Sequence, residues 1–391
     1  MKRGALLVAL LVIASACSST GTAPTSSGSG TATASTAGTE EEAVPMPQDR
    51  LDAIAGRYRA ACQSPGAAIG VRTHDGVDHY AVSGELAPGV PLDEDSQFLA
   101  GSVTKLFVAT AAYQLIASGD LSPDDTVDRF QPGWPRGDQI TVAMLLGHRS
   151  GMGDFGNDFS AQLRDLVLSD PTRSFSYAEV LDLVRAVPTV AEPGAEYHYT
   201  NANYIVLGAI VQDVSHQTLG ELLQSRVIQP LGLDRTIYGP DDLSAADAVV
   251  FHGLFDVAGT GTPVDIGQFP RTAALTVDPA GAGLFSTIPD LLVVTHALFA
   301  TDELLAPTQR EALAESVSTL TARDLLLPDQ FEIRGHGGAS PGAQTIVAHD
   351  ATHDTTVAVW CNRLDPGELE LLPSVSAANE VLRLGALGSP P

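Results

Sequence analysis

Residues 101–110 read GSVTKLFVAT and place a serine three residues before a lysine, at the start of an apolar segment with helical spacing. The chain has only two lysines, Lys2 and Lys105, and relies on arginine elsewhere. Residues i and i+3 of a helix share a face, with Cβ atoms about 5–6 Å apart. The pattern therefore predicts that Ser102 and Lys105 lie side by side where a helix begins.

A serine and a lysine in this arrangement can form a nucleophile with its base. The serine hydroxyl is a weak nucleophile until a base removes its proton, and a neutral lysine amine can do so. Burial beside the positive N-terminus of a helix favours the neutral amine. Arginine does not deprotonate, so the choice of lysine at position 105 favours a base. The alternative is that Ser102 caps the helix and Lys105 is a surface cation.

Composition limits the class of protein. The 391 residues are 44% hydrophobic and 17% charged, with a formal net charge of −26. This apolar content is sufficient for a globular core, and the length suits one large or two medium domains. Because the acidic excess repels phosphates, it argues against nucleic acid and anionic lipid headgroups as partners.

The N-terminus has the pattern of a secretory leader. Lys2 and Arg3 precede an apolar run that is too short to span a bilayer. The sequence ASAC at 14–17 resembles a lipobox, which implies removal of residues 1–16 and a lipid anchor on Cys17. The alternative is an ordinary signal peptide with a chance cysteine. Residues 17–45, rich in Ser, Thr, Gly and Ala, indicate a flexible tether outside the cytoplasm.

Strand patterns occur at both ends of the remaining domain, residues 46–391, and helical patterns lie between them. Expected strands cover 66–73, 77–86, 332–338, 343–350 and 355–364. Expected helices cover 48–63, 105–121, 141–152, 177–187, 203–227 and 372–387. This order predicts an α/β (α+β) domain whose antiparallel sheet is built from both termini, with a helical insertion at about 120–275.

Further motifs follow Ser102-x-x-Lys105 along the chain. They are LLGHRSGM (145–152), Tyr199-Thr200-Asn201, GAGLFST (281–287) and RGHGGAS (334–340). With them, residues 50–385 resemble the class C β-lactamase and D-alanyl-D-alanine carboxypeptidase family of serine hydrolases, which also includes esterases. Each motif alone is weak, but together they occur in the order of the family.

The resemblance implies the role of each residue. Ser102 would form an acyl-enzyme, with Lys105 and Tyr199 transferring protons to and from it. Asn201 would bond Lys105 and the substrate amide. The backbone N–H groups of Ser102 and Ala339 would form the oxyanion hole.

Other positions are expected to be structural. His148 and Ser150 would hold a turn between helix and loop. His349 and His353 are interpreted as solvated residues of a hairpin turn rather than zinc ligands. No metal or cofactor is expected.

The departure from the family pattern concerns the substrate. His336-Gly337-Gly338 stands where β-lactamases have Lys-Thr-Gly. Gly337 has no hydroxyl, and a histidine is charged only when its pKa permits. Recognition of a substrate carboxylate should therefore be weak, which favours an ester or a D-amino-acid peptide or amide as the acyl substrate. The alternatives are a catalytically silent lipoprotein that binds cell-wall peptide or a partner, and a β-lactamase.

The resemblance also bears on the cysteines. The family fold has a five-stranded antiparallel sheet flanked by helices, in which the first strand pairs with the last. This arrangement implies a Cys62–Cys361 disulfide. The alternative is two buried free thiols.

Overall fold

The computed structural model describes residues 46–153, 155, 160–250, 252–255, 262–364 and 372–387. The leader, the lipidation of Cys17 and the tether lie outside the described residues and stay predictions. Contacts group Ala43–Pro391 into one unit. No helix within the described ranges is both long enough and apolar enough to cross a bilayer.

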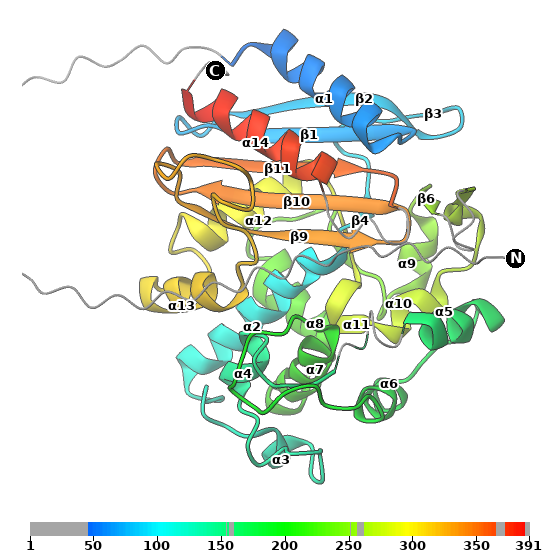
Figure 1. Cartoon of the computed structure of the whole chain (residues 1–391), viewed down its shortest axis with the longest axis vertical. Coiled ribbons are helices and arrows are strands. Elements are labelled where there is room, and N and C mark those ends of the chain that lie inside the picture. Colours follow the sequence, from blue (N-terminus) through cyan, green and yellow to red (C-terminus); the bar gives the residue numbers. More distant parts are fainter. Residues whose placement is uncertain are drawn as a thin grey trace, which may run out of the picture. The chain divides into compact units, whose positions relative to one another are not determined.

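The main sheet joins strands from the two ends of the domain (Figure 1). Its order is β3-β2-β1-β11-β10-β9, and each neighbouring pair is antiparallel. The strands are β1 Gly66–Arg72, β2 Asp78–Ala87, β3 Val90–Pro91, β9 Ile333–Ser340, β10 Ala343–Asp350 and β11 Thr355–Cys361. The five long strands are those expected, and β3 adds a two-residue edge. The predicted fold class is confirmed.

Helices cover both faces of this sheet. On one face lie α1 (Gln48–Cys62) and α14 (Leu372–Leu387), and on the other lies α12 (Ile288–Phe299). Alternate residues of β10 and β11 enter two different apolar clusters: Ile346 and Val359 pack toward α1 and α14, whereas Val347 and Trp360 face the helical region. Because both faces are covered, β10 and β11 are buried along their whole length.

The disulfide between Cys62 and Cys361 is present in the structure, with Cα atoms 6.7 Å apart. Cys62 ends α1, and β1 begins a short turn later at Gly66. Because β1 runs antiparallel to β11, Ala67 pairs with Cys361 and the end of α1 meets the end of β11. The disulfide thus joins the first helix to the last strand.

The inserted region is mainly helical. Its helices are α3 Val127–Phe130, α4 Val142–Leu146, α5 Ser160–Ser169, α6 Tyr177–Arg185, α7 Asn201–Ser215, α8 Leu219–Leu223, α9 Leu243–Ala248 and α10 Thr272–Val277. It also contributes short strands: β5 (Ile237–Tyr238) pairs with β8 (Leu284–Ser286), which in turn pairs with β4 (Phe98–Leu99), while β6 (Leu254–Phe255) and β7 (Val264–Asp265) pair with each other.

Two of the expected helices are shorter than their patterns. The 203–227 pattern divides where His216 adopts the left-handed conformation and Thr218 caps a new helix, α8. The 141–152 pattern is helical only as far as Leu146, because Gly147 ends α4 and His148 adopts a φ of 52°. Three further helices lie outside the insertion: α2 Thr104–Ser118 precedes it, and α11 Pro279–Ala282 and α13 Pro307–Val317 follow it.

The expectation that His349 is a solvated turn residue is wrong. The turn occupies 351–354, and β10 extends through His349 to Asp350. His349 is 2% exposed, its Nδ1 lies 3.0 Å from Thr356 Oγ1, and burial lowers its pKa to about 4. His353 lies in the turn but is half-buried and paired with Asp350.

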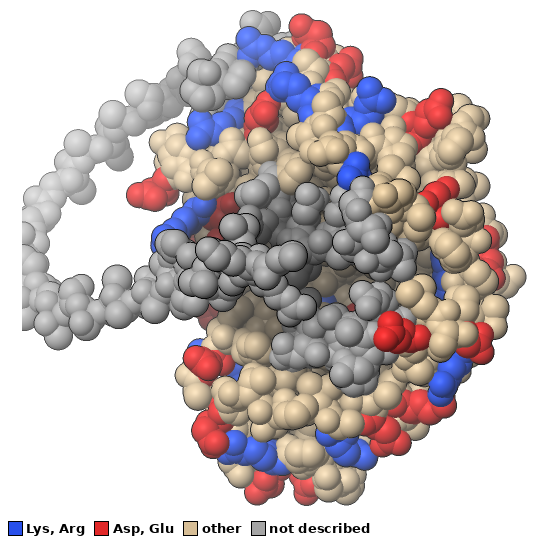
Figure 2. Space-filling view, turned by 45° about the vertical axis from the view of Figure 1, so that its right-hand side comes forward, with Lys and Arg blue, Asp and Glu red and all other residues tan. Residues whose placement is uncertain are grey.

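Charged side chains are dispersed over the face drawn in Figure 2. Among the coloured residues of that view, acidic and basic side chains are interspersed, and the basic ones form no large patch.

Candidate active site

Ser102 and Lys105 lie together at the start of α2. A 3-10 turn, Gly101–Val103, carries Ser102 and leads directly into the helix. Lys105 Nζ donates to Ser102 Oγ at 2.9 Å and to the Gly281 carbonyl at 3.0 Å. Lys105 is 0% exposed, whereas Ser102 is partly exposed, which excludes a surface cation at position 105.

Two glycines allow this turn to dock against the edge strand β9. A Cβ atom at Gly101, which adopts a φ of 56°, would lie 2.7 Å from Ala339 N. A Cβ atom at Gly338 would lie 2.2 Å from the Ala100 carbonyl oxygen. Any side chain at either position would push the turn from the strand. The glycines therefore bring Ser102 next to Ala339.

The pairing register of β9 leaves the Ala339 N–H available. Ser340 pairs with Ala343 across the two-residue turn Pro341-Gly342. In an antiparallel ladder, hydrogen-bonded pairs alternate with non-bonded pairs, so the Ala339–Gln344 pair is a non-bonded one. The Ala339 N–H then points to the open edge of β9, next to the start of α2. This is the geometry that the predicted oxyanion hole requires.

Tyr199, two residues before the start of α7, completes a cluster of aromatic and basic groups. Lys105 Nζ lies 5.2 Å from the centre of the Tyr199 ring. On the Tyr199 ring stacks the imidazole of His148, with ring centres 4.3 Å apart, and the His336 ring centre is 6.2 Å away. The structure thus brings three widely separated motifs to the amine of Lys105.

His336 is a neutral residue in this environment. It is 1% exposed, and its Nδ1–H donates to the Gly337 carbonyl at 2.5 Å. Burial, and then the positive charge of Lys105, lower its pKa to about 3. His336 therefore brings no positive charge to the site near neutral pH, and Gly337 brings no hydroxyl.

The expected contact of Asn201 with Lys105 is absent from the hydrogen bonds of the described residues. Asn201 Nδ2 donates instead to Asp278 Oδ2 at 2.7 Å. Asp278 packs closely against Gly281, where a Cβ atom would lie 2.2 Å from Asp278 Oδ1. Asn201 is thus connected to the Lys105 amine through Asp278 and the neighbouring Gly281, whose carbonyl accepts from Lys105 Nζ.

Sequence reasoning missed Asp278 and placed His148 outside the site. Asp278 stands three residues before Gly281, at the start of the loop that was expected only to support the site. His148 belongs to a motif that was expected to hold a turn. Its neighbour Ser150 does hold one, since Ser150 Oγ accepts the Met152 N–H at 3.1 Å.

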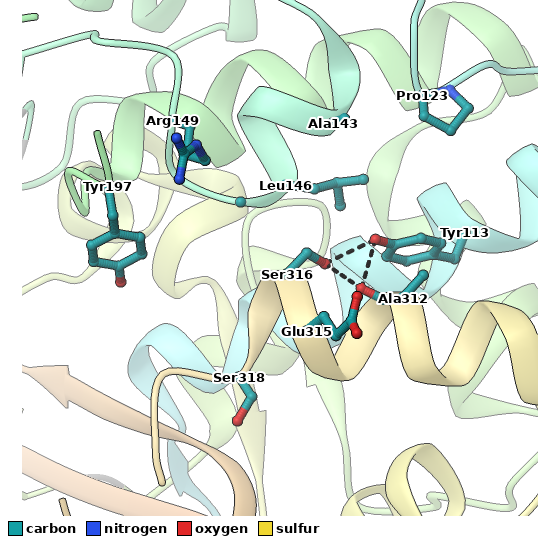
Figure 3. Close-up of a pocket in the computed structure, with 11 residues that line it drawn as sticks. Tyr113, Pro123, Ala143, Leu146, Arg149, Tyr197, Ala312, Glu315, Ser316 and Ser318 are labelled. Carbon is teal, nitrogen blue, oxygen red and sulfur yellow. Dashed lines mark hydrogen bonds between the residues drawn. The ribbon is translucent and has the colours of Figure 1, made fainter. Parts of the chain in front are cut away.

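A groove of about 570 Å³ lies beside this cluster, between α4 and α13 (Figure 3). Tyr113 lies in the groove, with its hydroxyl donating to the Ala312 carbonyl at 2.9 Å. Arg149 and Glu315 line it and are exposed. Tyr197, 54% exposed, connects the groove to the site, because its ring meets the His148 ring edge-on at 5.9 Å.

Comparison with known proteins places the chain in a family. The Beta-lactamase family model matches residues 51–378. The chain is 29% identical to penicillin-binding protein 4 of Amycolatopsis lactamdurans, over 70% of this chain and 68% of that protein. It is 32% identical to esterase EstB of Burkholderia gladioli, over 47% of this chain and 50% of that protein. The chain therefore belongs to the beta-lactamase family of serine hydrolases.

Solved structures share its fold. The D-amino acid amidase from Ochrobactrum anthropi SV3, complexed with L-phenylalanine amide, superimposes with a TM-score of 0.72 at 22% identity. That match covers 86% of this chain and 97% of the amidase chain. A penicillin-binding protein from Bacillus halodurans superimposes with a TM-score of 0.64 at 22% identity, over 83% of this chain and 98% of that chain. The resemblance inferred from the motifs is confirmed.

Proposed function

We propose that this protein is a cell-envelope hydrolase that acts through an acyl-enzyme on Ser102 and cleaves an ester or an amide or peptide of a D-amino acid. The hydrogen bond from the buried Lys105 amine to Ser102 Oγ carries the proposal. Lys105 Nζ lies within hydrogen-bond distance of both Ser102 Oγ and the Gly281 carbonyl, which places the amine where it can exchange a proton with the Ser102 hydroxyl.

In the proposed reaction, acylation moves one proton from Ser102 to the leaving group, and deacylation returns one proton to Ser102. Lys105 accepts the Ser102 proton as Oγ attacks the substrate carbonyl, and the N–H groups of Ser102 and Ala339 stabilise the oxyanion. Tyr199, next to the Lys105 amine, delivers a proton to the leaving group as the acyl bond breaks, and receives in its place the proton that Lys105 took from Ser102. Water then attacks the acyl-enzyme, and the proton that it loses returns through Tyr199 and Lys105 to Ser102 Oγ.

The neutral state of His336 supports the choice of substrate. A penicillin carries a carboxylate, which in this site would find neither a charged residue nor a hydroxyl at positions 336 and 337. Relatives named as an esterase and as putative D-alanyl-D-alanine carboxypeptidases, and neighbours named as D-amino acid amidases, are compatible with acyl substrates of the proposed kinds. The groove beside Tyr197 offers space for a peptide-sized substrate.

Intact mass measurement tests the proposal. The domain from residue 46 onward is mixed with a p-nitrophenyl ester, a D-alanyl amide or a penicillin, beside Ser102→Ala. An acyl adduct or product release that the Ser102→Ala protein lacks is the expected result. A folded wild-type protein that forms neither adduct nor product would favour the silent binding protein. A penicillin adduct that turns over quickly would favour a β-lactamase.

The cell-envelope location rests on residues 1–17 alone. We propose that the mature protein begins at Cys17 and carries a lipid there. Metabolic labelling with a fatty acid should mark the full-length protein and not Cys17→Ser. A protein secreted at equal level in unlabelled form by both would contradict the anchor.

A further inference from the structure

We propose that His148 is a positioning residue for Tyr199, acting as a neutral imidazole that fixes both the backbone around the tyrosine and the plane of its ring. This rests on the proposed function, in which Tyr199 transfers protons. His148 follows α4 after Gly147, is 1% exposed, and adopts a left-handed φ of 52°. It is the fourth residue of the LLGH motif and is not among the residues that line the groove of Figure 3.

The backbone on both sides of Tyr199 is bonded to this one histidine. The His148 carbonyl accepts the His198 N–H at 2.8 Å. The His148 ring accepts the Thr200 N–H at Nδ1, at 3.3 Å. Because residues 198 and 200 flank Tyr199, these two bonds fix the direction in which its side chain leaves the chain.

A third donor ties the same ring nitrogen to α7. Asn203 Nδ2 lies 3.1 Å from His148 Nδ1. The segment that enters α7 is therefore attached to His148 at three points.

The ring of His148 also orients the phenol. Its stacking on Tyr199 has an interplanar angle of 27°. Tyr204 lies 5.2 Å from the same imidazole, and Tyr197 meets it edge-on. Enclosed by these rings, the imidazole has little freedom to rotate, so the plane of the Tyr199 ring is set by packing against a fixed surface.

The contacts define the protonation state. A backbone N–H can only donate, so Nδ1 must be the acceptor and the ring proton must reside on Nε2. The charged and titratable groups facing the ring are Lys105, His336, His198 and the tyrosines at 197, 199 and 204. Burial and the charge of Lys105 lower the pKa of His148 well below its usual value, so Nδ1 keeps its lone pair.

The residue type follows from two separate requirements. The Nε2–H of His148 is buried without a hydrogen-bond partner among the described residues. An apolar ring would avoid the desolvation penalty of this donor. An apolar ring, however, could not accept the N–H groups of Thr200 and Asn203. Asparagine could accept a hydrogen bond and tolerates a positive φ, but it has no ring to stack on Tyr199. Histidine supplies both functions.

Three variants separate these functions. His148→Phe keeps a ring and removes the acceptor, His148→Asn keeps an acceptor and removes the ring, and Asn203→Leu removes one donor. His349→Asn is the matched control, because His349 is also buried and neutral but belongs to β10. Activity toward a p-nitrophenyl ester is measured as kcat per active site, with sites counted from the p-nitrophenol burst or the acyl adduct.

We expect kcat per site to fall by about 100-fold in His148→Phe, about 10-fold in His148→Asn and a few-fold in Asn203→Leu, since small displacements of a catalytic group carry losses of this order. KM should stay within about threefold, because His148 is buried and acts through Tyr199. His349→Asn should lower the melting temperature and leave kcat per site unchanged.

Two outcomes would overturn the inference. One is a His148→Phe or His148→Asn protein whose loss of activity disappears after correction for the number of active sites, which would make the residue merely structural. The other is a rise in KM with unchanged kcat, which would make it a substrate contact. A wild-type protein without esterase activity would contradict the proposed function itself, whereas an active wild type with unaffected variants would contradict only this inference.

Discussion

Two buried polar regions of this protein differ in whether their polar atoms have hydrogen-bond partners. At the junction of β1, β2 and β11, the fully buried Asn362 accepts the Gly66 N–H at 2.6 Å and donates to the Leu86 carbonyl at 3.1 Å. Around Lys105, by contrast, Nε2 of His148, Nε2 of His336 and Oδ1 of Asn203 are buried with no hydrogen-bond partner among the described residues.

The difference separates stability from function. A buried polar atom without a partner costs about 1–3 kcal/mol, so the junction contributes to stability and the cluster detracts from it. The cluster surrounds Tyr199 and Lys105, the two side chains that move protons in the proposed reaction. We expect substitutions in the cluster to reduce activity more than stability, and substitutions in the junction to do the reverse.

Lys105→Met should cause the largest loss of activity of these substitutions. An active Lys105→Met protein would remove the contrast between the two regions. Methionine fills a similar volume without a base, so kcat should fall by about 10³-fold, within the range for a lost general base. The free energy of unfolding in urea should stay constant or rise, because a buried polar group is removed. A protein that retains activity, or that unfolds, would contradict the assignment of Lys105.

Removing the disulfide tests the converse expectation, that a structural bond outside the cluster affects stability and not activity. Cys62→Ala combined with Cys361→Ala should lower the free energy of unfolding by about 2–4 kcal/mol, because the bond constrains the unfolded chain. kcat per active site should change less than twofold. A free-thiol assay that finds two thiols in the denatured wild type would show that the bond does not form.

Asn362→Leu should cost about 2–3 kcal/mol, because it leaves the Gly66 N–H and the Leu86 carbonyl buried and unpaired. The activity of the folded protein should not change. Gln131→Leu, at a partly exposed side chain whose bond to Asp213 is open to solvent, is a control for losing an amide where water can replace it. An equal loss of stability in both would remove the distinction between the two regions.

Acid should destabilise the protein through its neutral histidines. The folded pKa values are about 3 for His336 and about 4 for His349, below the value of 6.5 expected for an unfolded histidine. The unfolded state therefore binds more protons as the pH falls from 6.5 toward 4. The stability contributed by each neutral histidine is complete above pH 6.5 and is lost across this interval, by up to about 1.4 kcal/mol per pH unit. Urea unfolding of His349→Asn should show a correspondingly flatter pH dependence, and an unchanged slope would contradict the burial of His349.

Substitution of Arg149 in the groove should give the smallest change in activity. Arg149 is exposed, and an exposed charge contributes about 0–1 kcal/mol, so Arg149→Ala should lower kcat/KM by at most about fivefold. The loss should occur only for peptide-sized substrates that carry a carboxylate on the Tyr197 side, and not for p-nitrophenyl acetate. Arg50→Ala, an exposed arginine on α1, is the control. A similar decrease with both substrates would exclude the groove as a binding surface.

The strands were the best-predicted part of the fold. β10 and β11 are buried along their whole length because helices cover both faces of the sheet, and their apolar centres, IVA (346–348) and VAVWC (357–361), are visible in sequence. Helix ends were less well predicted. At His148 and His216 a non-glycine residue adopts a positive φ, and no apolar pattern records this. His349 was misassigned because a histidine inside a strand resembles the polar turn that follows it.

The sequence by itself determined the adjacency of Ser102 and Lys105, because helical geometry fixes neighbours three residues apart. It also determined the order of the motifs and hence the family, along with the strands that form the sheet. Only the tertiary structure decided that Asn201 bonds Asp278, that His336 is neutral and that His148 stacks on Tyr199. These features depend on burial and on contacts between residues tens to hundreds of positions apart, and local patterns carry no record of either.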